Sequence, residues 1–169
     1  NTVVMMQQFR QVDRKLDVVK NTLDKAIARI EATHAGELLS ASRMVDEVYT
    51  QYSLEGAFSQ DMLVRLALAE HDIKSLSIRF RQLVESRDLT DISNAGDIQQ
   101  ANYDAHSAML ASFMELRISY LRACVDMQEN PNSVDVSLER LKNVIDDGIV
   151  FWHQLQDRSR PLKTEIDNL

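Results

Sequence analysis

The sequence predicts an all-α protein, an antiparallel up-down-up-down bundle of four long helices with coiled-coil-like packing. Four glycines and two prolines in 169 residues are too few for a protein with many turns. Apolar residues recur at alternating spacings of four and three along most of the chain, which is the pattern of helices that pack side by side. We expect residues 1–169 to form a single helical-bundle domain, excised from a longer protein because the chain opens with Asn1 and not with an initiator Met.

The first predicted helix covers about residues 2–52. Its apolar seam changes phase after Ile30, where two consecutive steps of four lead through His34 to Leu38. Such a stutter locally unwinds a left-handed supercoil. Gly36 lies within the stutter and costs about 1 kcal/mol relative to Ala in a helix interior, so the helix bends there or packs closely against a neighbour. Before the stutter, the seam consists of Met5, Phe9, Val12, Leu16, Val19, Leu23, Ala26 and Ile30.

The second and third predicted helices cover about residues 59–87 and 97–129. Gly56 is expected to end the first helix and Ser59 to cap the second. A turn rich in Asp, Ser, Asn and Gly separates the second helix from the third. The third helix carries two apolar stripes, so it should be buried against more than one neighbour. The stripes are Met109, Phe113, Leu116, Tyr120, Ala123 and Met127, and Leu110, Met114, Ile118, Leu121 and Val125.

The fourth predicted helix covers about residues 133–167, after Asn130 and Pro131 have ended the third. Pro161 should kink or interrupt it. Gly148 occupies a seam position one turn from Trp152, and we interpret it as a dimple that admits a bulky side chain from another helix.

Aligning the helices from their turns leaves the start of the first helix without a partner. The second helix pairs with residues from about 22 to 52, so the preceding residues extend beyond the bundle by roughly 30 Å. An exposed apolar stripe of this length is typical of an interaction site, and we expect the first helix to be the longest and to protrude at its N-terminus. In the alternative, the helix breaks at His34 to Gly36 and its first half folds back into the bundle. The candidate interaction residues are Met5, Phe9, Val12, Leu16 and Val19.

Charge and cysteine content exclude some classes of function. The net charge of -7 comes from interspersed acidic and basic residues, without the basic stripe expected of a nucleic-acid-binding protein. Cys124 is the only cysteine, so an intrachain disulfide is impossible, and we interpret it as a small core residue. The sequence does not determine the cellular location of the protein, although it slightly favours the cytoplasm over an extracytoplasmic compartment. No segment is apolar for long enough to span a membrane, so membrane contact would come only through segments outside this chain.

The histidines are the candidates for a metal site. The helix alignment places His34, His106 and His153 at similar heights, and Glu31 with His34 has the Glu-x-x-His spacing of di-iron bundles. A second such pair is missing from the sequence, so we expect a polar layer that fixes helix register and neither metal nor cofactor. Nucleophile turns, phosphate loops and Cys-His pairs are absent as recognisable motifs, and we therefore predict a protein that is not an enzyme.

Three functional hypotheses follow from this architecture. The first is an interaction module that uses the exposed stripe to form a homodimer or to dock a partner helix. The second is an extracytoplasmic sensory domain, because the chain is similar in length and pattern to the four-helix ligand-binding domains of membrane receptors. That similarity is one of architecture, without a shared motif that would identify binding residues. The third is the soluble body of a membrane-associated or pore-forming effector, suggested by the uncharged start from Val3 to Met6.

Overall fold

The computed structural model describes residues 7–11, 13–15, 18, 33–86 and 95–158, and these residues are helical apart from short turns, with no strand among them. The elements are α2 (Thr33–Glu55), α3 (Gln60–Ser86), α4 (Ala95–Glu129), the 3-10 turn η2 (Pro131–Ser133) and α5 (Val134–Arg158). Residues 7–11, 13–15 and 18 are also helical, and we call them the N-terminal segment. The predicted all-α class is confirmed.

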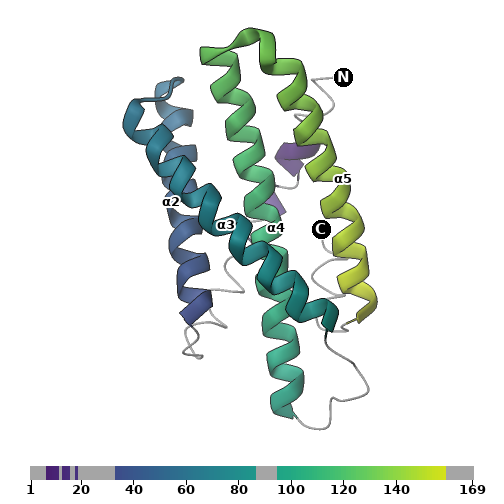
Figure 1. Ribbon diagram of the computed structural model, residues 1–169. Coiled ribbons are helices and arrows are strands. Elements are labelled where there is room, and N and C mark those ends of the chain that lie inside the picture. Colours follow the sequence, from purple (N-terminus) through teal and green to yellow (C-terminus); the bar gives the residue numbers. More distant parts are fainter. Residues whose placement is uncertain (1–6, 12, 16–17, 19–32, 87–94, 159–169) are drawn as a thin grey trace.

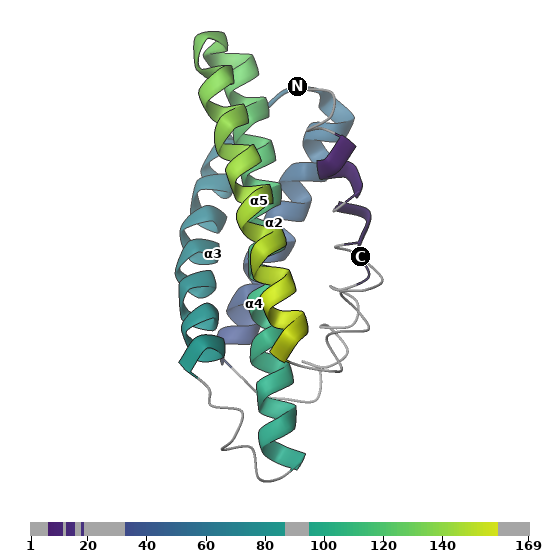
Figure 2. The ribbon, with the colours of Figure 1, turned by 90° about the vertical axis from the view of Figure 1, so that its right-hand side faces the viewer.

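Helix α4 occupies the centre of the fold. It contacts α2, α3 and α5, whereas α2 packs mainly on α3 and α4 among the helices described. In Figure 1, α2 and α4 run upward while α3 and α5 run downward, and Figure 2 shows the N-terminal segment on the opposite side of α4 from α3. Every residue from Ala105 to Val125 is buried or half-buried. The prediction that this helix packs against several neighbours is therefore confirmed, although Met127, at the end of one stripe, is exposed.

The turn between α2 and α3 has the predicted capping residues. Gly56 has a φ of 69° and donates its N–H to the Tyr52 carbonyl at 2.8 Å. This left-handed conformation favours glycine and ends α2. Ser59 then accepts the N–H of Met62 at 3.2 Å, which satisfies one of the unpaired donors at the start of α3.

Gly148 makes room for Trp152 of its own helix. A Cβ at Gly148 would lie 2.9 Å from Cζ2 of Trp152. The indole Nε1 donates to Ser112 Oγ at 3.3 Å, and the ring meets Phe113 edge-on at 4.4 Å between centroids. The predicted dimple exists, but the expectation that a different helix fills it is wrong, because the tryptophan one turn along α5 folds over the glycine.

The N-terminal segment packs on the bundle. Phe9 is only 1% exposed, and its ring stacks on Tyr120 of α4 at 4.1 Å between centroids. Tyr49 of α2 lies 6.1 Å from the same Tyr120 ring. Residues 9 and 49 would be about 60 Å apart in one straight helix. The predicted continuous helix over about residues 2–52 is therefore wrong.

The predicted overhang is wrong at Phe9 for the same reason, since an aromatic ring gains more from burial against Tyr120 than from exposure to water. The fold-back alternative agrees with this contact, but the break does not fall at Gly36, because α2 is helical through that residue. The remaining residues of the predicted stripe lie outside the described residues, as does the predicted fourth helix beyond residue 158. Those stripe residues are Met5, Val12, Leu16 and Val19.

Replacing Phe9 by Ala is expected to lower the free energy of unfolding by about 3 kcal/mol, because it removes a buried ring and leaves a cavity. The matched control is Gln8→Ala, which changes an exposed neighbour and should shift stability by less than about 0.5 kcal/mol. Urea unfolding followed by circular dichroism measures both variants. Equal, small effects of the two changes would contradict the burial of Phe9.

Candidate functional site

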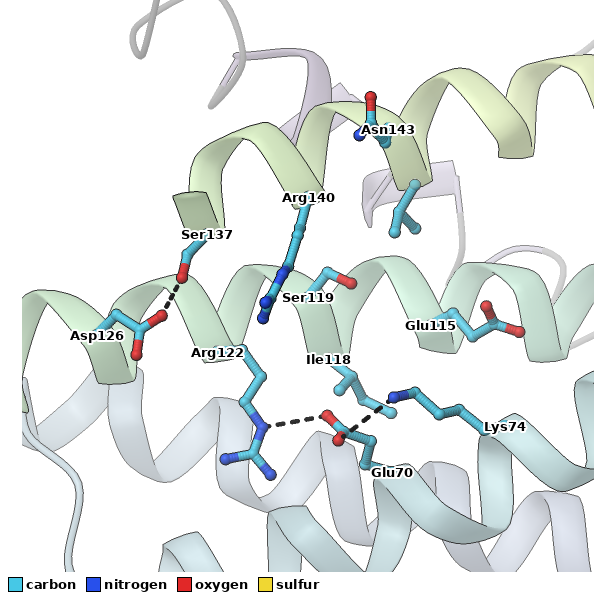
Figure 3. A pocket seen from close by; sticks show the side chains of 11 residues that line it. Glu70, Lys74, Glu115, Ile118, Ser119, Arg122, Asp126, Ser137, Arg140 and Asn143 are labelled. Atoms are coloured by element: carbon cyan, nitrogen blue, oxygen red, sulfur yellow. Dashed lines mark hydrogen bonds and ion pairs between the residues drawn. The ribbon is translucent and has the colours of Figure 1, made fainter. Parts of the chain in front are cut away.

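A polar pocket opens between α3 and α5 over the surface of α4 (Figure 3). The two outer helices each pack on α4 but scarcely touch each other. The pocket has a volume of about 470 Å³, and a smaller one of about 260 Å³ shares Glu115 and Val144 with it. We call the two together the α3–α5 groove. The charged side chains of the larger pocket are Glu70, Lys74, Glu115, Arg122, Asp126 and Arg140.

Three polar stripes, one on each helix, form this groove. Each stripe repeats at spacings of three and four, so its members share one face of their helix. On α4, this polar stripe forms a third face of the helix beside its two apolar stripes. The stripes are Glu70, Lys74, Ser77 and Arg81 on α3, Ser112, Glu115, Ser119, Arg122 and Asp126 on α4, and Ser137, Arg140 and Asp147 on α5, where Val144 is an apolar member of the same face.

Most charges at one end of the groove are paired. Glu70 accepts from Arg122 Nε at 3.1 Å and lies 3.7 Å from Lys74 Nζ. Asp126 accepts a hydrogen bond from the Ser137 hydroxyl. The partners come from α3, α4 and α5, so these contacts also hold the three helices around the pocket (Figure 3).

Arg140 is the exception at this end. Its side chain extends from α5 toward Ser119 and Arg122 (Figure 3). In the part of the chain that the structure describes, Arg140 forms no ion pair or hydrogen bond. A guanidinium presents several donors in a planar fork that matches a carboxylate or phosphate. Because Arg140 lines the pocket without a described acidic partner and Arg122 lines it as well, the pocket favours an anionic ligand.

The other end of the groove is acidic. Glu115 of α4 and Asp147 of α5 line the smaller pocket together with Arg81. The Arg81 guanidinium lies 4.1 Å from the centroid of the Phe151 ring, an attractive cation–π contact. Neither Glu115 nor Asp147 is engaged in an ion pair or hydrogen bond among the residues described.

A second cluster surrounds Arg117 in the interior, and we call its four residues, Asp13, Asp46, Tyr49 and Arg117, the Arg117 cluster. Arg117 is 5% exposed. Its guanidinium binds Asp46 of α2 and Asp13 of the N-terminal segment, with Nε 2.8 Å from Asp13 Oδ1, and lies 4.6 Å from the centroid of the Tyr49 ring. A buried guanidinium needs such partners because desolvating it alone is costly. The cluster therefore ties the N-terminal segment to α2 and α4.

Four groups in or beside this cluster, the buried Cys124 and the half-buried Tyr49, Tyr52 and Tyr120, hold their protons tightly. Burial, followed by the charge of Asp13, raises the pKa of Tyr49, and burial followed by contact with Cys124 raises the pKa values of Tyr52 and Tyr120. Burial also raises the pKa of the Cys124 thiol, although hydrogen bonds from Tyr52 and Tyr120 oppose that shift. The thiol is buried, which confirms the prediction of a core cysteine.

The predicted metal candidates do not assemble into a site where they are described. The half-buried His106 has Nδ1 2.7 Å from the Asn102 carbonyl, and His153 is exposed. Glu31 and the side chain of His34 lie outside the described residues. No group of three or more His, Cys, Asp or Glu side chains in the described ranges could hold a metal ion. Within the same ranges, no helix has the length and hydrophobicity needed to cross a membrane.

No protein-family model, no curated protein and no solved structure matches this chain. None of the groove residues was predicted as a site from the sequence, because none of them belongs to a catalytic or metal-ligating motif. The available signal was the polar repeat on the third helix, Ser112, Glu115, Ser119, Arg122 and Asp126, beside its two apolar stripes.

Replacing Arg117 by Met is expected to lower the free energy of unfolding by about 3–5 kcal/mol, because two carboxylates lose their buried partner. The triple variant Arg117→Met, Asp13→Asn, Asp46→Asn should recover part of this loss. Arg14→Met, at an exposed position, is the control and should have little effect. Urea unfolding measures all three; a loss no larger for Arg117→Met than for the control would contradict the buried ion pairs.

Stability is expected to fall as the pH rises above about 9, near the ordinary pKa of thiols and phenols. The raised pKa values of Cys124, Tyr49, Tyr52 and Tyr120 mean that the folded protein holds these protons more tightly than the unfolded chain does. Their stabilisation is complete below the unfolded pKa values and is lost as the pH climbs toward the folded ones. Tyr120→Phe, which keeps the stacked ring, should give a shallower fall in urea unfolding between about pH 8 and 11. If the unfolding free energies of the parent protein and of Tyr120→Phe fall equally steeply with pH, this prediction is wrong.

Proposed function

We propose that this chain is a ligand-binding helical domain and that the α3–α5 groove binds a small organic anion. Arg140 carries the proposal, because it extends a cation into a pocket where no described carboxylate neutralises it. Arg122 of α4 lines the same pocket; its guanidinium is directed toward Glu70 of α3 and keeps donors beyond the Nε that binds this carboxylate. The planar fork of the Arg140 guanidinium matches the two oxygens of a carboxylate.

The size and the lining of the groove support this proposal. A volume of about 470 Å³ falls within the range of small-molecule sites, which are clefts with a few convergent polar groups. The Arg122–Glu70 contact joins α4 to α3, and the Ser137–Asp126 hydrogen bond joins α5 to α4. The pocket is therefore held in shape before a ligand enters, which reduces the cost of ordering it.

Among the three sequence-based hypotheses, the sensory domain is the one that a ligand groove supports. We further propose that α2, α3, α4 and α5 make up an up-down-up-down four-helix bundle, the architecture of the receptor domains that this chain is similar to. Dimerisation or partner docking through the N-terminal stripe stays a prediction. Phe9 is no longer among its candidate residues, because it is buried in the core. The role as the body of a membrane-associated effector also stays a prediction, as does the absence of enzymatic activity.

Replacing Arg140 by Gln is expected to weaken the binding of small carboxylates by about tenfold or more, equivalent to roughly 1.4 kcal/mol. Isothermal titration with acetate, propionate and succinate measures the effect. Lys142→Gln is the control, since Lys142 is exposed on the same helix outside the groove. Because Arg140 has no ion pair among described residues, its replacement should leave the thermal midpoint within about 2 °C of the parent. Equal affinity of the two variants, or no binding of any anion, would overturn the proposed function.

A further inference from the structure

We infer that the ligand of the α3–α5 groove is a linear zwitterion, whose anionic group lies at Arg122 and Arg140 and whose cationic group lies at Glu115 and Asp147. This inference rests on the proposed function, to which it adds the chemical class and the length of the ligand. The carrying observation is that Arg122 and Arg140 line the larger pocket of the groove and Asp147 lines the smaller one, while Glu115 lines both.

The register between α4 and α5 fixes the two ends. The helices are fastened at two heights, by the Ser137–Asp126 hydrogen bond and by Trp152 Nε1 donating to Ser112 Oγ. Between these points the helices run in opposite directions (Figure 1). Arg140 therefore lies at about the height of Arg122.

The same register places Asp147 at about the height of Glu115. Seven residues separate Glu115 from Arg122, and seven separate Arg140 from Asp147. At the rise of an α-helix, the two pairs are about 10 Å apart. The groove thus presents opposite charges at a defined separation.

Each end of the groove keeps a net charge when all of its charged side chains, including those in ion pairs, are counted. The larger pocket has three basic and three acidic side chains, and one of the acidic ones, Glu115, also lines the smaller pocket. With Glu115 counted at the acidic end, Arg122, Arg140 and the Glu70-bound Lys74 exceed Glu70 and Asp126 by one positive charge. At the acidic end, Glu115 and Asp147 outnumber Arg81 by one negative charge. The Arg81 guanidinium is occupied by the face of Phe151. A molecule with one charge of each sign compensates both ends.

Between the two ends, Ile118 and Val144 line the larger pocket beside Ser119. Aliphatic side chains here favour an apolar chain between the two charged groups of the ligand. Two kinds of molecule supply that chemistry. A tripeptide with free termini spans about 10 Å when extended, and an ω-amino acid of comparable length has the same charges without peptide bonds.

Titration calorimetry with trialanine, N-acetyl-trialanine, trialanine amide and 8-aminooctanoate tests the inference. At least one zwitterion should bind about tenfold more tightly than a ligand that lacks one of its charges, a difference of roughly 1.4 kcal/mol. Octanoate is the counterpart of 8-aminooctanoate that lacks the amine. Trialanine binding identifies a peptide ligand, and binding of 8-aminooctanoate alone identifies an ω-amino acid; either result supports the inference.

Glu115→Gln should remove the advantage of the free amine while it leaves the affinity for octanoate or N-acetyl-trialanine unchanged. The control is Glu139→Gln, an exposed acidic residue of α5 outside the groove. Equal binding of zwitterions and their amine-free counterparts, with Arg140→Gln weakening both, would overturn the inference and leave the proposed function standing. If no anion of either kind binds, both are overturned.

Discussion

The buried guanidinium of Arg117 constrains the whole arrangement around α4. Its charge can remain in the interior only with carboxylates beside it, and the chain supplies one from α2 and one from the N-terminal segment. Those two elements must therefore meet on the same face of α4. Stacking of Phe9 on Tyr120, one turn from Arg117, adds an apolar contact to the same junction. The side of α4 that faces away from α3 is closed in this way (Figure 2).

On the other side of α4, the distribution of polar and apolar faces keeps the groove between α3 and α5 open. The two apolar stripes of α4 can be buried against α2, α3, α5 and the N-terminal segment. The third stripe of α4 carries charges, which need polar partners or water. Because α3 and α5 present polar stripes of their own toward it, apolar packing cannot draw those two helices together there. A groove between them follows from the composition of three facing stripes.

Periodicity predicted the helices well, because each seam reports the local geometry of its own helix. The range 59–87 compares with Gln60–Ser86 in the structure, and 97–129 with Ala95–Glu129. One error was local: Leu83 continues the seam of α3 in sequence, but Val84 is the buried residue, since a straight helix drifts relative to a heptad repeat. The fold-back of the N-terminal segment escaped prediction because turn alignment assumes straight helices. The groove escaped it because each polar stripe, taken alone, has the composition of a solvated face, and only the packing of three helices brings the stripes together.

Trp152 gives the molecule an optical property as a consequence of its packing. It is the single tryptophan of the chain, it lies folded over Gly148, and its indole N–H is bonded to Ser112. Ser112 lines the smaller pocket of the groove. The emission of one fluorophore is thus coupled, through one hydrogen bond, to the polarity of the cleft beside it. We expect filling or hydration of that cleft to change the intrinsic fluorescence of the protein, without any label.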